Sequence, residues 1–118
     1  ARYLAYMNTD AQLLAQLRRG VIEHCVLALL DRGPRYGFDL VRALAAVEGL
    51  GTTEGTIYPL LSRLRKDGLL DTSWQPSDQG PPRRYYELTE QGRTALEGFR
   101  RHWRSFSAAV DQVLEGDK

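Results

Sequence analysis

Residues 53–88 have the sequence TEGTIYPLLSRLRKDGLLDTSWQPSDQGPPRRYYEL, and this stretch decides the fold. Its first part predicts a helix over Thr53–Lys66, because apolar residues recur there at amphipathic spacing. The residues expected to face inward are Ile57, Leu60, Leu61 and Leu64. Pro59 lacks an N–H group and presses on the preceding turn, so we expect this helix to begin late or to bend there.

Two short strands are expected after the helix, over Leu69–Trp74 and Arg84–Leu88. Ser77–Pro82 supplies turn residues between them, and this loop is long enough to project as a wing. A helix with a free polar face beside a basic hairpin is the layout of a winged helix-turn-helix. The predicted fold class is therefore mainly α with a small β-hairpin.

Three helices are expected before this stretch. Asp10–Arg19 predicts a short helix, and Val21–Leu30 is so apolar that it predicts the central helix of the core. Tyr36–Glu48 predicts a third helix that ends at a glycine-rich turn. The stripe expected to be buried on this third helix consists of Leu40, Val41, Leu44 and Val47.

The C-terminal segment predicts one long helix, with Thr89 as its N-cap and its end near Glu115. Large apolar residues recur along it at alternating steps of three and four, the seam by which helices pair. One protomer could hardly cover this stripe, so we expect a homodimer interface. Its expected residues are Leu96, Phe99, Trp103, Phe106, Val110 and Val113.

These elements predict three parts: an N-terminal extension with a short helix (1–19), a winged helix domain (20–88) and a C-terminal dimerisation helix (89–118). We expect the natural start at Met7, and we leave Ala1–Tyr6 out of the reasoning about the fold.

Composition narrows the classes of function. The chain has 118 residues, a formal net charge of +1 and one cysteine. A strongly basic DNA-coating protein is excluded, so DNA binding would require basic groups gathered on one face. The longest apolar run, Cys25–Leu30, is too short to cross a bilayer. With a single cysteine that cannot form an internal disulfide, a cytoplasmic protein without a membrane role is expected.

We find no catalytic or metal-binding pattern. Cys25 lies among apolar residues and is expected to be an inert thiol. His24 is its neighbour in sequence but not on the same helix face, and His102 has no second ligand at metal spacing. Glu97 and Asp111 fit solvated helix charges. We therefore expect no enzyme activity, no cofactor and no metal.

The helix over Thr53–Lys66 favours binding to duplex DNA. Thr56, Tyr58 and Arg63 can reach base edges or nearby phosphates, with arginine suited to guanine. Lys66, near the end of the helix, is better suited to anchor a phosphate.

The wing adds two adjacent arginines, Arg83 and Arg84. Neighbouring residues of a strand point to opposite faces, so at most one of them is expected to meet DNA directly from the strand, unless the loop twists. The alternative function is a winged helix that uses the same face to bind another protein.

Several strings resemble those of the PadR family of bacterial transcriptional regulators. They are CVLALL at 25–30, PRYGFDL at 34–40, EGTIYPLLSRL at 54–64, KDGLL at 66–70 and RYYELT at 84–89. The resemblance covers about residues 18–114 in the same order, and GTIYP followed by YYELT is its most specific part. The single C-terminal helix resembles the compact subgroup of that family, and the resemblance also accounts for Pro59.

The resemblance implies a dimeric repressor of detoxification, resistance or metabolic genes that binds inverted repeats, commonly of the ATGT…ACAT kind. It also implies release by small aromatic or cationic compounds, with Trp103 stacking on the ligand. Phe99 and Phe106, one turn away, are further effector-binding candidates that favour packing. Packing between protomers is the alternative role of Trp103. The candidate DNA-binding residues are Tyr36, Thr53, Thr56, Tyr58, Pro59, Ser62, Arg63, Lys66, Arg83 and Arg84.

Overall fold

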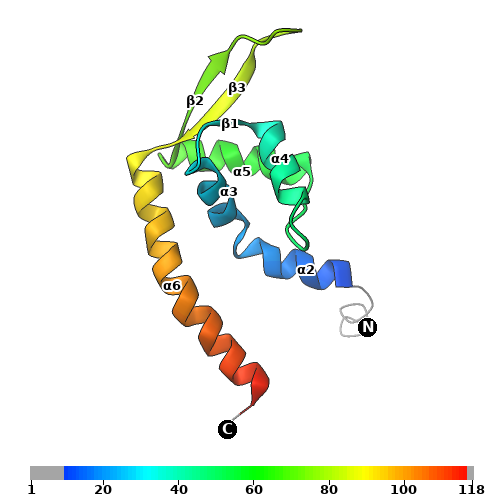
Figure 1. The fold of residues 1–118 in the computed structure, drawn as a ribbon, viewed down its shortest axis with the longest axis vertical. Coiled ribbons are helices and arrows are strands. Elements are labelled where there is room, and N and C mark those ends of the chain that lie inside the picture. Colours follow the sequence, from blue (N-terminus) through cyan, green and yellow to red (C-terminus); the bar gives the residue numbers. More distant parts are fainter. Residues whose placement is uncertain (1–9, 117–118) are drawn as a thin grey trace.

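The computed structural model describes residues 10–116, so the expected start at Met7 and the segment Ala1–Tyr6 lie outside the described residues. The described elements, in chain order, are α2 (Asp10–Arg19), α3 (Ile22–Leu30), β1 (Arg35–Tyr36), α4 (Gly37–Ala45), α5 (Glu54–Lys66), β2 (Leu70–Gln75), β3 (Arg83–Leu88) and α6 (Glu90–Glu115) (Figure 1). The molecule is mainly helical with one small sheet, as the sequence predicts.

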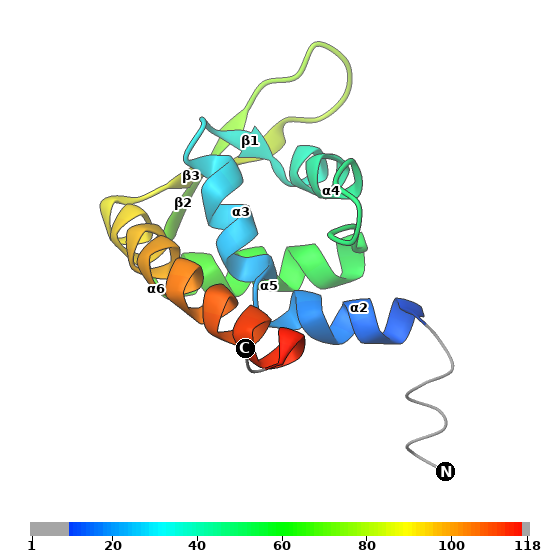
Figure 2. The ribbon, with the colours of Figure 1, turned by 60° about the horizontal axis from the view of Figure 1, so that its bottom comes forward.

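The core lies around α3, which has α6 along one side, α4 on the other and α5 behind it (Figure 2). The inward residues of α5 are all buried, which confirms the amphipathic pattern on which the fold was predicted. The core cluster consists of Ile22, Val26, Leu27, Leu30, Leu40, Leu44, Ile57, Leu60, Leu61, Leu64, Leu70, Tyr86, Leu88 and Leu96.

The sheet has the strand order β1-β3-β2, and both pairings are antiparallel. Leu70 pairs with Leu88 at the buried end of the hairpin, and Arg35 pairs with Tyr86. The sequence predicted the hairpin alone, because β1 has two residues and cannot show the alternation that marks a strand. Its pairing with β3 ties the start of α4 to the wing.

The start of α6 is anchored to the winged helix. The hydroxyl of Thr89 accepts a hydrogen bond from the Gly92 amide at 3.0 Å and donates one to the Gly68 carbonyl at 2.8 Å, so Thr89 is the expected N-cap. Gly92 lies so close to the Leu69 carbonyl oxygen and the Leu88 side chain that a Cβ has no room there. Only a glycine allows this contact.

Leu96 corrects one expectation. The sequence assigned it to the seam between protomers, but its side chain is 2% exposed and belongs to the core of its own chain. Asp31, the C-cap residue of α3, adds ion pairs to Arg93 and Arg100 of α6, each at 3.8 Å. Beyond these contacts α6 extends away from the core (Figure 1).

Two expectations about the helices are also corrected. Val47 is 50% exposed, because α4 ends at Ala45 and Val47 lies in the turn that follows. Pro59 does not delay α5, which begins at Glu54 and continues through the proline to Lys66. The carbonyl deprived of its donor belongs to Gly55, an exposed residue of the first turn, where water can bind instead.

The short helix α2 buries none of its residues. Its apolar side chains Leu13, Leu14 and Leu17 are 39–62% exposed, so their stripe is not used by the core. Arg18 connects α2 to the turn after α4 by donating a hydrogen bond to the Gly49 carbonyl at 3.1 Å. Within residues 10–116, no helix combines the length and apolar character needed to span a bilayer.

Candidate nucleic-acid interface

The outer face of α5 carries the candidate base-reading residues. Burial of the apolar stripe forces the opposite side of the helix outward, where Thr56, Tyr58, Pro59, Ser62 and Lys66 are all exposed. The helix therefore presents a surface that mixes hydroxyl donors and acceptors with a cation. Such a surface can form hydrogen bonds with base edges and phosphates.

Close packing fixes α5 against α4. A Cβ on Gly37, the first residue of α4, would lie 2.5 Å from Cε1 of Tyr58. The glycine thus lets the Tyr58 ring lie against the start of α4. Burial raises the pKa of the Tyr58 phenol, and the nearby Glu54 and Tyr86 raise it further. The hydroxyl therefore keeps its proton and can donate a hydrogen bond.

Thr53 occupies the N-cap position of α5, yet its hydroxyl forms no hydrogen bond to the backbone of the helix. Instead it donates to the Thr56 hydroxyl at 3.4 Å, and both side chains are exposed. The two hydroxyls thus form a polar pair at the start of the outer face. Loss of this weak mutual contact on binding a stronger partner would cost little.

Arg63 is exposed, but its guanidinium already has acidic partners within its own chain. Its guanidinium donates a hydrogen bond to Glu23 of α3 at 2.7 Å and lies 3.8 Å from Asp67. The hydrogen bond to Glu23 and the attraction between the two charges raise the pKa of Arg63. The sequence listed Arg63 as a base-reading candidate but did not reveal this competing partner on another helix.

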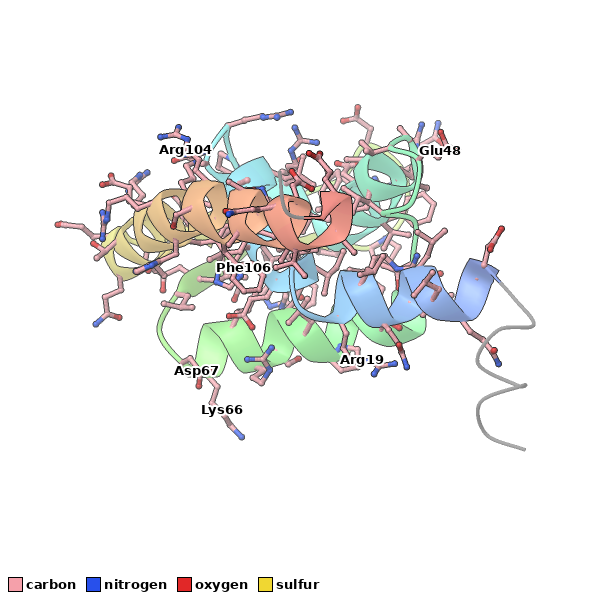
Figure 3. The ribbon with its side chains drawn as sticks, turned by 90° about the horizontal axis from the view of Figure 1, so that it is seen from below. Arg19, Glu48, Lys66, Asp67, Arg104 and Phe106 are labelled. Carbon is pink, nitrogen blue, oxygen red and sulfur yellow. The ribbon has the colours of Figure 1, made fainter. Side chains whose placement is uncertain are left out.

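Two further cations were missed by the sequence analysis. Arg65 is exposed in the last turn of α5 and forms no ion pair among residues 10–116. Arg19, at the end of α2, lies on the same side of the molecule as Lys66, opposite Arg104 and Glu48 (Figure 3). The run Arg63-Leu64-Arg65-Lys66 was the available signal for Arg65, whereas Arg19 required the position of α2.

The wing arginines point to opposite faces of β3, as the strand alternation predicts, and each lies over an aromatic ring. The guanidinium carbon of Arg83 is 4.8 Å from the centre of the Tyr36 ring. That of Arg84 is 4.8 Å from the centre of the Trp74 ring. Tyr36 also lies against Tyr85, with ring centres 4.0 Å apart, and its hydrogen bond raises the pKa of Tyr85.

A shallow hollow of about 460 Å³ lies between one face of the wing, α4 and the first turn of α5. It brings Tyr36 and Arg83 together with Glu54 of the first turn of α5, although these residues are far apart in sequence. Arg84 does not line it. The residues around the hollow are Tyr36, Phe38, Asp39, Arg42, Glu54 and Arg83.

This arrangement agrees with what comparison to known proteins finds. The model of the transcriptional regulator PadR-like family matches residues 26–98, more than half of the chain. The chain belongs to the PadR-like family. As a member, it is a DNA-binding transcriptional regulator and not an enzyme.

Solved structures of PadR-like regulators are similar over nearly their whole length. A regulator from Eggerthella lenta is 34% identical, with a TM-score of 0.84 over 97% of this chain and 99% of that one. One from Bacillus cereus is 35% identical, with a TM-score of 0.77 over 86% and 99%. A Lysinibacillus sphaericus protein is 24% identical over 83% of this chain and 92% of its own length.

The PadR-like chain has a second candidate site, a groove of about 770 Å³ between α2, the turn after α4 and α6. On α6 it is lined by Phe99, Trp103, Phe106 and Val110, and on α2 by Leu14 and Leu17. Trp103 is 43% exposed and Phe106 is 62% exposed, so the ring surfaces lie open. The structure brings the three predicted effector residues together.

Phe99 has a partner inside its own chain. Its ring stacks on His24 of α3, with ring centres 4.1 Å apart and planes 7° from parallel. Trp103 continues the stack at 5.7 Å and 15° from Phe99. Nδ1 of His24 is buried and has no hydrogen-bond partner among the described residues. The sequence did not suggest this ladder, because His24 and Phe99 are 75 positions apart.

Among residues 10–116, Cys25 and the possible metal ligands add no further candidate site. Burial raises the pKa of the half-buried Cys25 thiol, which makes it a poor nucleophile at neutral pH. Over residues 10–116, no three side chains of histidine, cysteine, aspartate or glutamate gather where they could hold a metal ion.

Proposed function

We propose that this PadR-like regulator is a repressor that binds an inverted-repeat operator as a homodimer and leaves it when a small flat aromatic or cationic compound binds. The observation that carries the proposal is the open apolar stripe of α6 beside the groove of about 770 Å³, next to a complete winged helix. Acting on an operator would place the protein in the cytoplasm.

The free part of α6 supports dimerisation. Trp103, Phe106, Val110, Val113 and Leu114 are between 40% and 80% exposed in the single chain. An apolar stripe of this length on one helix is typical of a surface that a partner covers. The proposal requires that a two-fold axis across α6 place the two copies of α5 at the separation of successive major grooves.

The chemistry of the groove supports an aromatic or cationic effector. Trp103 and Phe106 offer flat faces for stacking, and a cation over such a face is attracted to the ring electrons. Glu48 and Asp111 line the same groove and add negative charge. Arg18 also lines it and offsets one of these two charges, so one net negative charge remains for a ligand with a flat aromatic part and a single cationic end.

The ladder Trp103–Phe99–His24 supports a route from this groove to the DNA-binding unit. A compound that stacks on Trp103 would displace Phe99, and Phe99 lies directly on α3. Release would then be a population shift toward a dimer whose two α5 helices no longer match adjacent grooves.

Fluorescence anisotropy tests operator binding. The probe is duplex DNA that the protein has selected from random sequence, measured in excess non-specific competitor. If three cations per protomer touch phosphate, the dimer neutralises six, and the log–log salt slope is roughly −5. Selective binding with a steep slope supports the operator role. Binding without sequence preference, or a slope near zero, contradicts it.

The effector is tested with rhodamine 6G, a flat aromatic cation. The chain has two tryptophans, so the variant Trp74→Phe reports on Trp103 alone by fluorescence quenching. Release of operator by the dye should be lost in Trp103→Ala. Equal release in both proteins would show that the dye acts on the DNA and would contradict the effector site.

A further inference from the structure

Both faces of the wing carry a cation held by an aromatic ring. Arg83 lies over Tyr36 on one face of β3 and Arg84 over Trp74 on the other, each with 4.8 Å between guanidinium carbon and ring centre. Trp74 and Arg84 are direct partners across β2 and β3, so their side chains share one face of the sheet. Tyr36 pairs with Tyr85, two residues beyond Arg83, and so lies on the opposite face.

Neither charge is taken up by an acidic partner. Ion pairs among residues 10–116 involve Arg63, Arg93 and Arg100, not the wing arginines. Nε of Arg84 is buried without a hydrogen-bond partner among these residues. Stacking fixes the direction of each guanidinium while its charge remains available to an anion.

Trp74 is otherwise unexplained. Its side chain is 63% exposed, near the end of β2 that lies away from Leu70, and it belongs neither to the core cluster nor to the residues packed against that cluster. A large exposed aromatic residue on a regulator that binds DNA is accounted for if its task is to hold Arg84. The same reasoning applies to Tyr36 and Arg83 on the other face.

The loop between β2 and β3 has contacts of its own that restrict it. The Ser77 hydroxyl lies 2.9, 3.4 and 3.1 Å from the carbonyl oxygens of Gln79, Gly80 and Pro81. Gly80 has φ +95°, a conformation that glycine adopts readily. Prolines at 76, 81 and 82 restrict the chain further. A wing whose loop is restricted in this way loses little conformational entropy on binding.

We propose that Trp74 and Tyr36 are positioning residues that hold Arg84 and Arg83 on opposite faces of the wing. The wing enters one DNA groove edge-on, and the two arginines contact phosphates of the two different strands that wall the groove. This replaces the expectation that at most one wing arginine meets DNA. It rests on DNA binding, and it adds which residues engage which strand.

The first test is the salt dependence of binding to a duplex of about 30 base pairs, long enough for two half-sites. Arg83→Ala and Arg84→Ala should each make the log–log slope shallower by about 2, one phosphate per protomer. Arg104→Ala on α6, far from the wing, is the matched control and should leave the slope unchanged. An unchanged slope for Arg84→Ala would overturn the proposal.

The assignment of each arginine to one DNA strand is tested by ethylation interference. The experiment uses the duplex selected by the wild-type protein, with each DNA strand labelled in turn. In one half-site, Arg83→Ala should abolish interference at phosphates of one strand, and Arg84→Ala at phosphates of the other. Loss on the same strand in both variants would contradict edge-on entry, even if both variants bind more weakly.

The positioning role is tested by asking whether the effects of Trp74 and Arg84 substitutions on DNA affinity depend on each other. Trp74→Ala should weaken binding several-fold in the wild type and have no further effect in Arg84→Ala, whereas Trp74→Phe should keep most of the affinity. When Trp74→Ala is combined with Arg83→Ala, their effects on the binding free energy should add. Thermal melting must be the same for all variants, since a purely structural role of Trp74 would shift it.

These outcomes separate the inference from the operator proposal. A wild type that binds any duplex without sequence preference still supports the inference if both slopes change. A wild type that binds no duplex at all overturns the inference together with DNA binding.

Discussion

Nη2 of Arg63 on α5 lies 2.7 Å from Oε1 of Glu23 on α3, so the helix that carries the candidate DNA-binding residues is linked to the central helix of the core by a charge pair. Glu23 is followed directly by His24, which stacks on Phe99 of α6. One turn of α3 therefore contacts both the helix with the candidate DNA-binding residues and the helix that lines the proposed effector groove.

The pair predicts an unusual effect on DNA affinity. Glu23→Gln should tighten DNA binding several-fold and steepen the log–log salt slope by about 2, because it frees Arg63 in each protomer to reach phosphate. Arg63→Ala should weaken binding less than Lys66→Ala, since Lys66 has no competing acidic partner among residues 10–116. Anisotropy at several salt concentrations measures both.

Glu97→Gln is the control for this experiment, because it removes the same charge from an exposed position on α6. If it tightens binding as much as Glu23→Gln, the effect comes from net charge and not from release of Arg63.

The contact at Gly92 predicts a large loss of stability from one methyl group. Gly92→Ala should lower the free energy of unfolding by about 1–3 kcal/mol, because the new Cβ meets the Leu69 carbonyl and the Leu88 side chain. Urea unfolding followed by circular dichroism measures it. Gly98→Ala is the matched control on the same helix, since its Cβ would meet only an Arg101 side-chain nitrogen at 3.8 Å. It should be neutral or raise stability by about 0.5–1 kcal/mol.

The buried start and the exposed remainder of α6 predict different effects of substitution, the first on stability and the second on dimerisation. Leu96→Ala should lower the free energy of unfolding by about 2–5 kcal/mol, because its side chain is buried in its own chain. Phe106→Asp should instead leave the fold intact and shift the protein to monomer in analytical ultracentrifugation. Ser105→Asp, which adds the same charge beside the stripe, should remain dimeric. A monomeric wild type would refute the dimer.

Burial of Cys25 predicts slow thiol chemistry. Because its pKa is raised, the thiolate fraction at pH 8 is below that of the unfolded chain, and reaction with a thiol reagent such as DTNB should accelerate strongly in urea. The unfolded thiol loses its proton near pH 8.5. Above that pH the folded state holds more protons than the unfolded state, so the free energy of unfolding should fall as pH rises. In Cys25→Ala this fall should be smaller, and an identical pH dependence in both proteins would contradict the prediction.

Periodicity was enough to predict the helical framework. The stripes of α3 and α5 are long and regular, and Thr89 has the side chain that an N-cap requires, so local rules identified these elements. The same rules failed where the chain pairs with something distant. The strand β1 exists because Arg35 and Tyr36 pair with β3 about 50 positions away.

The candidate site was predicted less completely for a related reason. Exposure of the α5 residues follows from one helix, but the partner of Arg63 lies 40 positions earlier and the platform for Arg84 lies on another strand. Leu96 shows the same limit, since a seven-residue seam cannot reveal which of its members are covered by the same chain. These assignments depend on tertiary contacts that spacing does not encode.

The anchored start of α6 turns the helix into a lever arm. It has 26 residues and a length of roughly 39 Å, and its first turns cannot move independently of the winged helix because of Thr89, Gly92 and Leu96. In a dimer joined along its far end, a tilt of about 5° there displaces the DNA-facing unit by roughly 3 Å. That distance is about the rise of one base pair. In such a dimer, a small ligand that tilts α6 could therefore shift each winged helix along the DNA by about one base pair.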